Sequence, residues 1–211
     1  MPLLGGFWRY QEISNIDYMN SSINKMIVAD IFGVTPALIA LGRTINADII
    51  VDPYDGKMMN FDNEAQAYHY FTDNVGLDVY VNKLSKIMKE CADKTIIIGF
   101  SIGAAAIWKL SASTDIEIIK RVKYAICFYG SQIRHLTTLS PNFDVQLIFP
   151  KSEAHFDVQA LVERLANKKR VTAVQVDFLH GFMNSHSNNF NQLGYTAHVK
   201  LLQQNINLSD Y

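Results

Sequence analysis

Residues 96–104 read Ile-Ile-Ile-Gly-Phe-Ser-Ile-Gly-Ala, and two more alanines follow directly. Three consecutive isoleucines are typical of a strand buried on both faces, whereas the alanines favour a helix. Between them, Gly99–Gly103 fits the pattern G-x-S-x-G, in which a tight strand-to-helix turn presents a serine and glycines permit close backbone approach. The pattern predicts that Ser101 is a nucleophile. A match of five residues also fits an ordinary turn that contains a serine, so other parts of the chain must decide.

Composition bounds the class of protein. The chain has 211 residues, 49% of them hydrophobic, which suits a single domain over residues 1–211. Its 19 basic and 20 acidic side chains give a net charge of −1 without a long run of one sign, so we expect neither nucleic acid nor a membrane as partner. No apolar run approaches the roughly 18 residues of a membrane span. Met1–Tyr10 lacks the basic segment of a secretory signal.

The cysteine content favours a reducing compartment. Cys91 and Cys127 have no metal-ligand spacing, and two cysteines cannot build a disulfide framework. We therefore expect a soluble, cytoplasmic protein without a bound metal. The composition does not predict its oligomeric state.

Short β-branched or aromatic runs alternate with helical patterns. Strands are predicted at Lys25–Ile31, Asp48–Tyr54, Thr95–Phe100, Tyr124–Gly130, Val145–Pro150 and Thr172–Phe178, with an edge strand at Phe7–Ile13. Helices are predicted at Pro36–Ile45, Asn74–Cys91, Ile102–Ala112, Asp157–Leu165 and Tyr195–Ile206, and a loop at Asn184–Gln192. This alternation predicts an α/β fold with a mostly parallel sheet covered by helices on both faces. Ligands bind such sheets at the carboxyl ends of the strands, where Ser101 lies.

A serine nucleophile needs a histidine base and an acid that orients it. His180 follows the last predicted strand, beside Gly181, which places it at the same edge of the sheet as Ser101. The other histidines lie in or beside helical or loop patterns: His69, His135, His155, His186 and His198. After the preceding strand, Glu153 and Asp157 are the candidate acids. With either one the chain order is Ser, acid, His, as in α/β-hydrolases.

With these residues in place, the sequence resembles the dienelactone hydrolase family of α/β-hydrolases. The resemblance spans about Lys25 to Ile206. It rests on these segments in order: Asp30-Ile31-Phe32-Gly33-Val34-Thr35-Pro36, Asp52-Pro53-Tyr54, Gly99-Phe100-Ser101-Ile102-Gly103, Phe128-Tyr129-Gly130 and His180-Gly181-Phe182. It implies an α/β-hydrolase fold without a large lid. It also implies cleavage of small esters or lactones, with no metal or organic cofactor.

The resemblance also implies roles for individual residues. Ser101 would be the nucleophile and His180 the base. The backbone amides of Ile31 and Ile102 would form the oxyanion hole, one from a strand's loop and one from a helix N-terminus. Asp30 stands where similar enzymes have glutamate, and this shorter carboxylate either takes part in catalysis or only caps the loop.

Three further departures separate this chain from well-known members of the family. Ser101 replaces their cysteine, so it depends fully on His180. The acid loop has Pro150 and Glu153 where the family has glycine and aspartate, and one added residue leaves Asp157 as a second choice. We favour Glu153, because Asp157 precedes a predicted helix and suits its cap.

The last departure concerns the substrate. Similar enzymes hold a substrate carboxylate with arginines, but Asp55–Asn82 contains Lys57 as its sole Lys or Arg residue, and Asn184 stands at the second place. Arg134 follows another strand and either points toward the crevice or faces the surface. We therefore expect neutral esters to be preferred to carboxylate-bearing lactones.

Two functions of different classes fit these observations. The first is a serine hydrolase that cleaves small ester, thioester or lactone substrates through an acyl-enzyme. The second is a catalytically degenerate protein of the same fold that binds or regulates, which the irregular acid loop and the altered Asp30 position would explain. A peptidase of this fold is a third alternative, but peptidases commonly carry extra domains or lids, for which this chain has no spare length.

Overall fold

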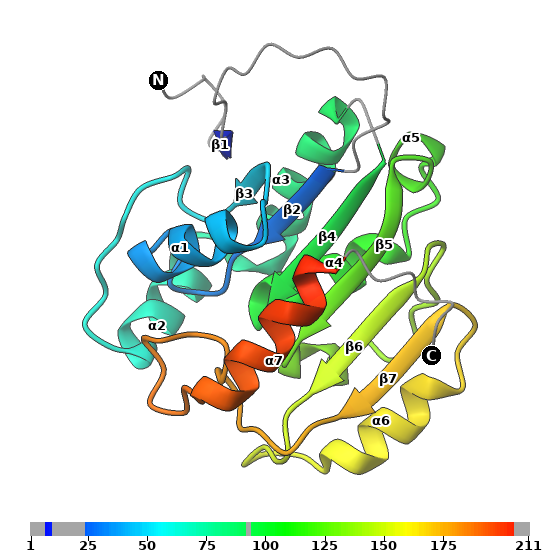
Figure 1. Cartoon of the computed structure of the whole chain (residues 1–211). Helices are drawn as coiled ribbons and strands as arrows, with labels where there is room; N and C mark the ends of the chain where they lie inside the picture. Colours follow the sequence, from blue (N-terminus) through cyan, green and yellow to red (C-terminus); the bar gives the residue numbers. More distant parts are fainter. Residues whose placement is uncertain (1–6, 10–23, 92–93, 205–211) are drawn as a thin grey trace.

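A seven-stranded sheet organises the computed structural model, which describes residues 7–9, 24–91 and 94–204 (Figure 1). Its strands are β1 (Phe7–Arg9), β2 (Asn24–Val28), β3 (Ile49–Val51), β4 (Thr95–Phe100), β5 (Val122–Phe128), β6 (Val145–Phe149) and β7 (Val171–Gln175). They lie in the order β1-β3-β2-β4-β5-β6-β7. All neighbours pair in parallel except β1, which is antiparallel to β3. The predicted mostly parallel sheet is thus confirmed.

Helices cover both faces of this sheet. They are α1 (Pro36–Thr44), α2 (Glu64–Asn74), α3 (Gly76–Glu90), α4 (Ile102–Ser111), α5 (Ile116–Ile119), α6 (Val158–Ala166) and α7 (Gln192–Gln203), with a 3-10 helix η1 (Ser131–His135). One apolar core joins the sheet to α3, α4 and α6, and a second joins the opposite face to α1 and α7. In Figure 1, α1 and α7 lie in front of the sheet and α3 behind it. The fold is that of an α/β-hydrolase, and no large lid is present in the part of the chain that the structure describes.

The strand β4 lies in the middle of the sheet because its side chains suit burial on both faces. Ile97 packs into the core on the α4 side and Ile98 into the core on the α1 and α7 side, and both are at most 1% exposed. The three alanines of α4 are fully buried, since small side chains let this helix approach the sheet closely. The strand therefore holds Ser101, which follows it, in a rigid frame.

Several predicted boundaries were wrong. The predicted strands took in residues of the turns that follow them, so that β2 ends at Val28 rather than Ile31, and β7 ends at Gln175 rather than Phe178. The predicted helix Asn74–Cys91 begins at Gly76, whose φ of +74° breaks the chain away from α2. The predicted edge strand is present at Phe7–Arg9, and residues 10–13 lie outside the described residues.

Other elements were missed. The helix α2 carries few apolar residues on a single stripe, and only Ala67 and Phe71 of it are buried, so its sequence gives a weak helical signal. The elements α5 and η1 are too short to show a period. The closing helix α7 begins at Gln192 rather than Tyr195, because the Asn191 side chain accepts a hydrogen bond from the Gly194 amide and caps it.

Candidate active site

The turn between β4 and α4 holds Ser101 in a strained conformation. Its φ of 50° and ψ of −111° lie outside the regions that residues with a β-carbon normally adopt. The Ser101 amide donates to the Phe128 carbonyl of β5 at 3.0 Å, which ties the turn to the neighbouring strand. Backbone strain of this kind persists where the surrounding structure enforces it, and it is common at functional sites.

Two glycines make this turn possible. A β-carbon on Gly103 would lie 2.3 Å from the Val28 carbonyl oxygen and 2.5 Å from that of Ala29. A β-carbon on Gly99 would lie 2.5 Å from the Ile107 side chain. The pattern G-x-S-x-G therefore reflects backbone packing at both glycines, and Ser101 projects from the turn at the carboxyl end of β4.

The loop after β7 brings His180 to Ser101. The Ser101 Oγ and His180 Nε2 atoms lie 3.0 Å apart, and His180 Nδ1 lies 2.7 Å from Glu153 Oε1. An ionised carboxylate can only accept, so the proton of the neutral imidazole lies on Nδ1. Nε2 is then free to accept the Ser101 hydroxyl proton. The structure thus brings Ser101, His180 and Glu153 into one hydrogen-bonded chain.

The loop after β6 separates the two candidate acids. Glu153 pairs with Phe156 in an isolated antiparallel bridge, and its side chain is 16% exposed. Asp157 is exposed, and it accepts a hydrogen bond from the Ala160 amide at 3.1 Å as the cap of α6. The structure therefore places Glu153, and not Asp157, against His180.

A second serine, which the sequence analysis missed, joins this chain. The Ser131 hydroxyl donates to Glu153 Oε1, and its Oγ atom lies 3.0 Å from His180 Nδ1. Partial burial acts to raise the pKa of Glu153, but the hydrogen bonds from His180 and Ser131 outweigh it and hold that pKa below its usual value. Ser131 follows β5, the strand between those that lead to Ser101 and Glu153. A polar residue at that strand end is the signal that would have found it.

The two backbone amides that the resemblance assigns to an oxyanion hole follow two neighbouring strands, Ile31 after β2 and Ile102 after β4. The Ile102 amide belongs to the first turn of α4, where N–H groups have no partner within the helix. The Ile31 amide lies in the turn after β2, and the Tyr54 hydroxyl fixes this turn by donating to the Ile31 carbonyl at 2.6 Å. Neither amide makes a hydrogen bond within the described residues. Both are therefore free to donate to an oxygen atom of a bound molecule.

Asp30 binds its own loop and the loop that follows His180. It accepts hydrogen bonds from the Phe32 amide at 2.9 Å and from Asn184 Nδ2 at 2.7 Å. Removal from water raises the pKa of Asp30, although both hydrogen bonds act to lower it. Asp30 thus links two loops of the site, and it makes no hydrogen bond to Ser101.

Arg134 lies on η1, away from the nucleophile. Its guanidinium donates to the Ser131 carbonyl at 2.8 Å and lies over the Phe156 ring, 5.3 Å from the ring centre. It belongs to neither of the two hollows described below. Arg134 therefore packs against the acid loop.

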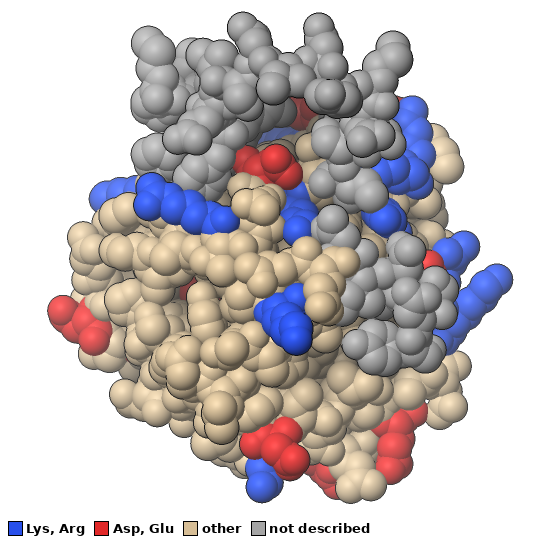
Figure 2. Space-filling model, in the orientation of Figure 1, with Lys and Arg blue, Asp and Glu red and all other residues tan. Residues whose placement is uncertain are grey.

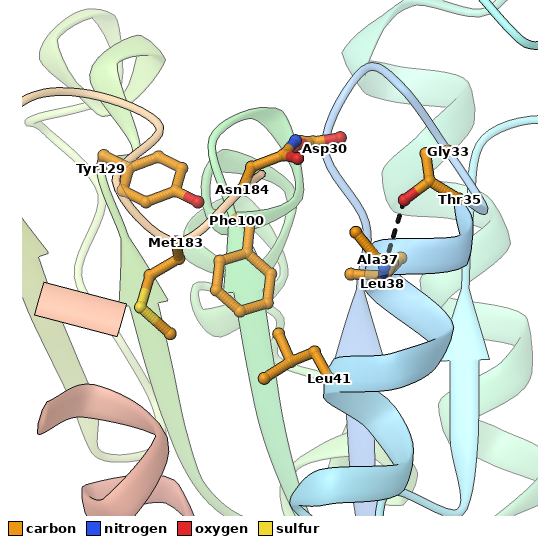
Figure 3. A pocket seen from close by; sticks show the side chains of 10 residues that line it. All are labelled: Asp30, Gly33, Thr35, Ala37, Leu38, Leu41, Phe100, Tyr129, Met183 and Asn184. Carbon is orange, nitrogen blue, oxygen red and sulfur yellow. Dashed lines mark hydrogen bonds between the residues drawn. The ribbon is translucent and has the colours of Figure 1, made fainter. Parts of the chain in front are cut away.

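Two adjoining hollows open at this edge of the sheet. The first contains Ser101 and His180 and is lined further by Asp30, Ile31, Phe32, Glu64, Tyr129, Gly181, Asn184 and Ser187. The second shares Asp30, Tyr129 and Asn184 with the first and is otherwise mostly apolar (Figure 3). Among the described residues, no lysine or arginine lines either hollow.

The face in Figure 2 and the described residues give no other indication of a ligand. In Figure 2 the middle of the face in view is largely uncharged, and charges of both signs are scattered over it and along its margin. Within the described residues, no three His, Cys, Asp or Glu side chains are grouped to hold a metal ion. In the same part of the chain, each helix is too short or too polar to cross a membrane.

Comparison with known proteins gives one curated relative of substantial identity. No protein-family model matches the chain. The uncharacterized protein YczH of Bacillus subtilis is 31% identical over 175 residues, which cover 79% of this chain and 84% of YczH.

Solved structures with the same fold include several hydrolases. The dienelactone hydrolase-like promiscuous phosphotriesterase P91 from metagenomic libraries has a TM-score of 0.60 at 12% identity, with 89% of this chain and 88% of P91 covered. A structure described as m3DLH has a TM-score of 0.58 at 13% identity, covering 90% and 88%. Est1E from Butyrivibrio proteoclasticus has a TM-score of 0.55 at 10% identity, covering 88% of each chain. At these identities the likeness establishes the fold.

Proposed function

Since the chain belongs to the same family as YczH of Bacillus subtilis and has the α/β-hydrolase fold of dienelactone hydrolase-like proteins, we propose that it is a serine hydrolase. Its substrates are small esters, thioesters or lactones, and the reaction passes through an acyl-enzyme. The observation that carries this proposal is the hydrogen-bonded chain of Ser101, His180 and Glu153. A serine becomes a nucleophile where such a base accepts its proton.

The geometry supports the following steps. His180 Nε2 accepts the Ser101 proton as Oγ attacks the substrate carbonyl, and Glu153 stabilises the imidazolium that forms. The Ile31 and Ile102 amides donate to the developing oxyanion. His180 then gives its proton to the leaving group, and the acyl group stays on Ser101. Water, deprotonated by His180, releases the acid and restores the serine.

The position of Glu153 favours this function over a degenerate binding protein. The unusual acid loop was one of two reasons to consider that alternative, yet Glu153 lies 2.7 Å from His180 and also accepts from Ser131. A carboxylate held by two donors preserves the imidazole tautomer that catalysis needs. The proposal includes a cytoplasmic location, which Cys127 supports as a buried thiol.

A fluorophosphonate probe tests the proposal, because it reacts only with an activated serine. The wild-type protein is expected to be labelled at Ser101 and to hydrolyse p-nitrophenyl acetate. The Ser101→Ala variant should lose labelling and roughly 10³–10⁶-fold in kcat, because members of such a triad act as a unit. Absence of both labelling and turnover in the folded wild-type protein would favour the binding protein instead.

A further inference from the structure

The second hollow adjoins the reaction centre and differs from it in chemistry. Its floor is formed by the buried side chains of Leu41, Phe100 and Met183, and Leu38 of α1 lines its wall (Figure 3). It shares Tyr129 and two other residues with the hollow that contains Ser101. A group attached to a carbonyl at Ser101 can therefore extend into an apolar space.

One polar group at this junction lacks a partner. The Tyr129 side chain is 1% exposed, and its hydroxyl donates no hydrogen bond to any described residue. The Met183 backbone amide approaches the phenolic oxygen as a donor and acts to lower the pKa of Tyr129. Because an N–H group cannot accept a hydrogen bond, the phenolic proton still has no acceptor. Burial raises the pKa of Tyr129 well above its usual value, which keeps that proton in place. Buried hydroxyl groups normally have partners, so this proton is free for a ligand.

The Tyr129 hydroxyl group lies at the second hollow, which its side chain lines. Tyr129 has a φ of 41°, a conformation that is rare for a residue with a β-carbon, and its ring packs 4.9 Å from the His180 ring. In Figure 3 the phenolic oxygen points into the space between Met183 and α1. A bound group in that space would meet the proton directly.

The other two side chains that the hollows share, Asp30 and Asn184, already make hydrogen bonds. The Asn184 side chain donates through Nδ2 to Asp30 at 2.7 Å, and its Oδ1 atom accepts from the His186 backbone amide at 2.9 Å. Asp30 is acidic, and no described lysine or arginine lines the hollow, so the described residues offer an anionic group no counter-charge here. The hollow suits an uncharged group.

We propose that this second hollow is a substrate subsite for an uncharged, mainly apolar acyl or alcohol group that carries an ether or carbonyl oxygen, and that the Tyr129 hydroxyl donates to this oxygen. The inference rests on the proposed hydrolase function and narrows its substrate class. The proposal predicts that Tyr129 favours esters with an acceptor oxygen in the acyl or alcohol group over alkyl esters of the same size.

Matched ester pairs test the role of Tyr129. On the acyl side, p-nitrophenyl methoxyacetate is compared with p-nitrophenyl butyrate. On the alcohol side, 2-methoxyethyl acetate is compared with butyl acetate. Each pair differs by one oxygen in place of a methylene group. The Tyr129→Phe variant removes only the hydroxyl. For one of the two pairs, its ratio of kcat/KM for the ether ester to kcat/KM for the alkyl ester should be about tenfold lower than in the wild type. The pair that shows this change tells whether the acyl or the alcohol group of the substrate occupies the hollow.

A second variant tests the space itself. Leu38→Trp should fill the hollow and lower the kcat/KM ratio of p-nitrophenyl butyrate to acetate by about tenfold. Ala40→Trp, on the exposed side of the same helix, is the matched control and should leave that ratio unchanged. Circular dichroism and the Tm verify that each variant is folded.

The outcomes separate this inference from the proposed function. Unchanged ratios for both ether pairs in folded Tyr129→Phe, while the wild-type protein shows Ser101-dependent turnover, would overturn the inference and leave the hydrolase standing. If the wild-type protein hydrolyses none of these esters, the proposed function fails, and the inference fails with it.

Discussion

The turns that carry Ser101 and Glu153 into the site are built in opposite ways. Residues 99–103 are buried except for the partly exposed Ser101, and backbone contacts with β2 and β5 hold them. In residues 151–157, only Glu153 and Phe156 are withdrawn from solvent, and hydrogen bonds from Ser131 and His180 hold the acid in place. The conformation of the serine turn depends on the residues of the turn itself. The position of Glu153 in the acid loop depends on hydrogen bonds from distant residues.

This difference implies that the two turns respond differently to substitution. In the serine turn the backbone has no spare room, so an added methyl group should affect folding. In the acid loop most side chains face solvent, so only loss of the contacts at Glu153 should affect activity.

The largest effect is expected at Gly103. A methyl group there meets two carbonyl oxygens of the backbone after β2, so Gly103→Ala should lose about 3 kcal/mol of stability or fail to fold. Ala154→Ser, in the exposed acid loop, is the control and should unfold like the wild-type protein. Urea unfolding measures both. Equal stability of Gly103→Ala and the wild type would show that the serine turn is not tightly packed.

The acid loop should show its effect in the rate. Glu153→Gln should lower kcat roughly 10²–10⁴-fold, because an amide supports the wrong imidazole tautomer. Asp157→Asn should change kcat little, since asparagine caps a helix about as well as aspartate. Steady-state kinetics with p-nitrophenyl acetate measure both variants. The reverse ranking would assign the acid to Asp157.

Ser131 should have a smaller effect, because it acts through Glu153 and His180. Ser131→Ala is expected to lower kcat about tenfold with little change in KM, the value of one hydrogen bond to a charged group. Ser131→Thr keeps the hydroxyl and should restore most of the rate. Equal loss of rate in the Ala and Thr variants would mean that packing at this position, and not the hydrogen bond, is what matters.

The smallest effect concerns stability against acid. Because the pKa of Glu153 is below its usual value, its carboxylate stabilises the folded protein at pH above the unfolded value of about 4.3, and this contribution is lost as pH falls through the folded pKa. The wild type should exceed Glu153→Gln in stability by about 1 kcal/mol at pH 7. The difference should shrink toward pH 3. Urea unfolding at several pH values measures it, and a difference that stays constant with pH would contradict the lowered pKa.

The same contrast explains what could be predicted from the sequence. The strand-to-helix turn at Ser101 was predicted correctly because nine consecutive residues carry its signals. The isoleucines indicate a buried strand, the glycines a close backbone approach and the alanines a buried helix. The sheet was predicted for the same reason, since its strands are continuous apolar runs. Strand ends were placed too late, because residues such as Ile31 are apolar but lie in turns.

The contacts around Glu153 depend on segments far apart in the chain. The expected helix cap at Asp157 led us to favour Glu153, but the sequence could not show that Ser131 reaches the same carboxylate from 22 residues away. Nor could it show that Asn184 binds Asp30, which lies 154 residues earlier. The unpaired hydroxyl of Tyr129 likewise follows from three-dimensional packing, since an unpaired group leaves no pattern in a sequence.

The central claim is that Ser101 becomes acylated. The most direct measurement is mass spectrometry of the protein after brief reaction with p-nitrophenyl acetate and acid quenching, followed by peptide mapping. We expect an acetyl group on the peptide that contains Ser101, and no such adduct in Ser101→Ala. Continued turnover with the acetyl group on another residue, or with no covalent adduct at all in either protein, would contradict the account.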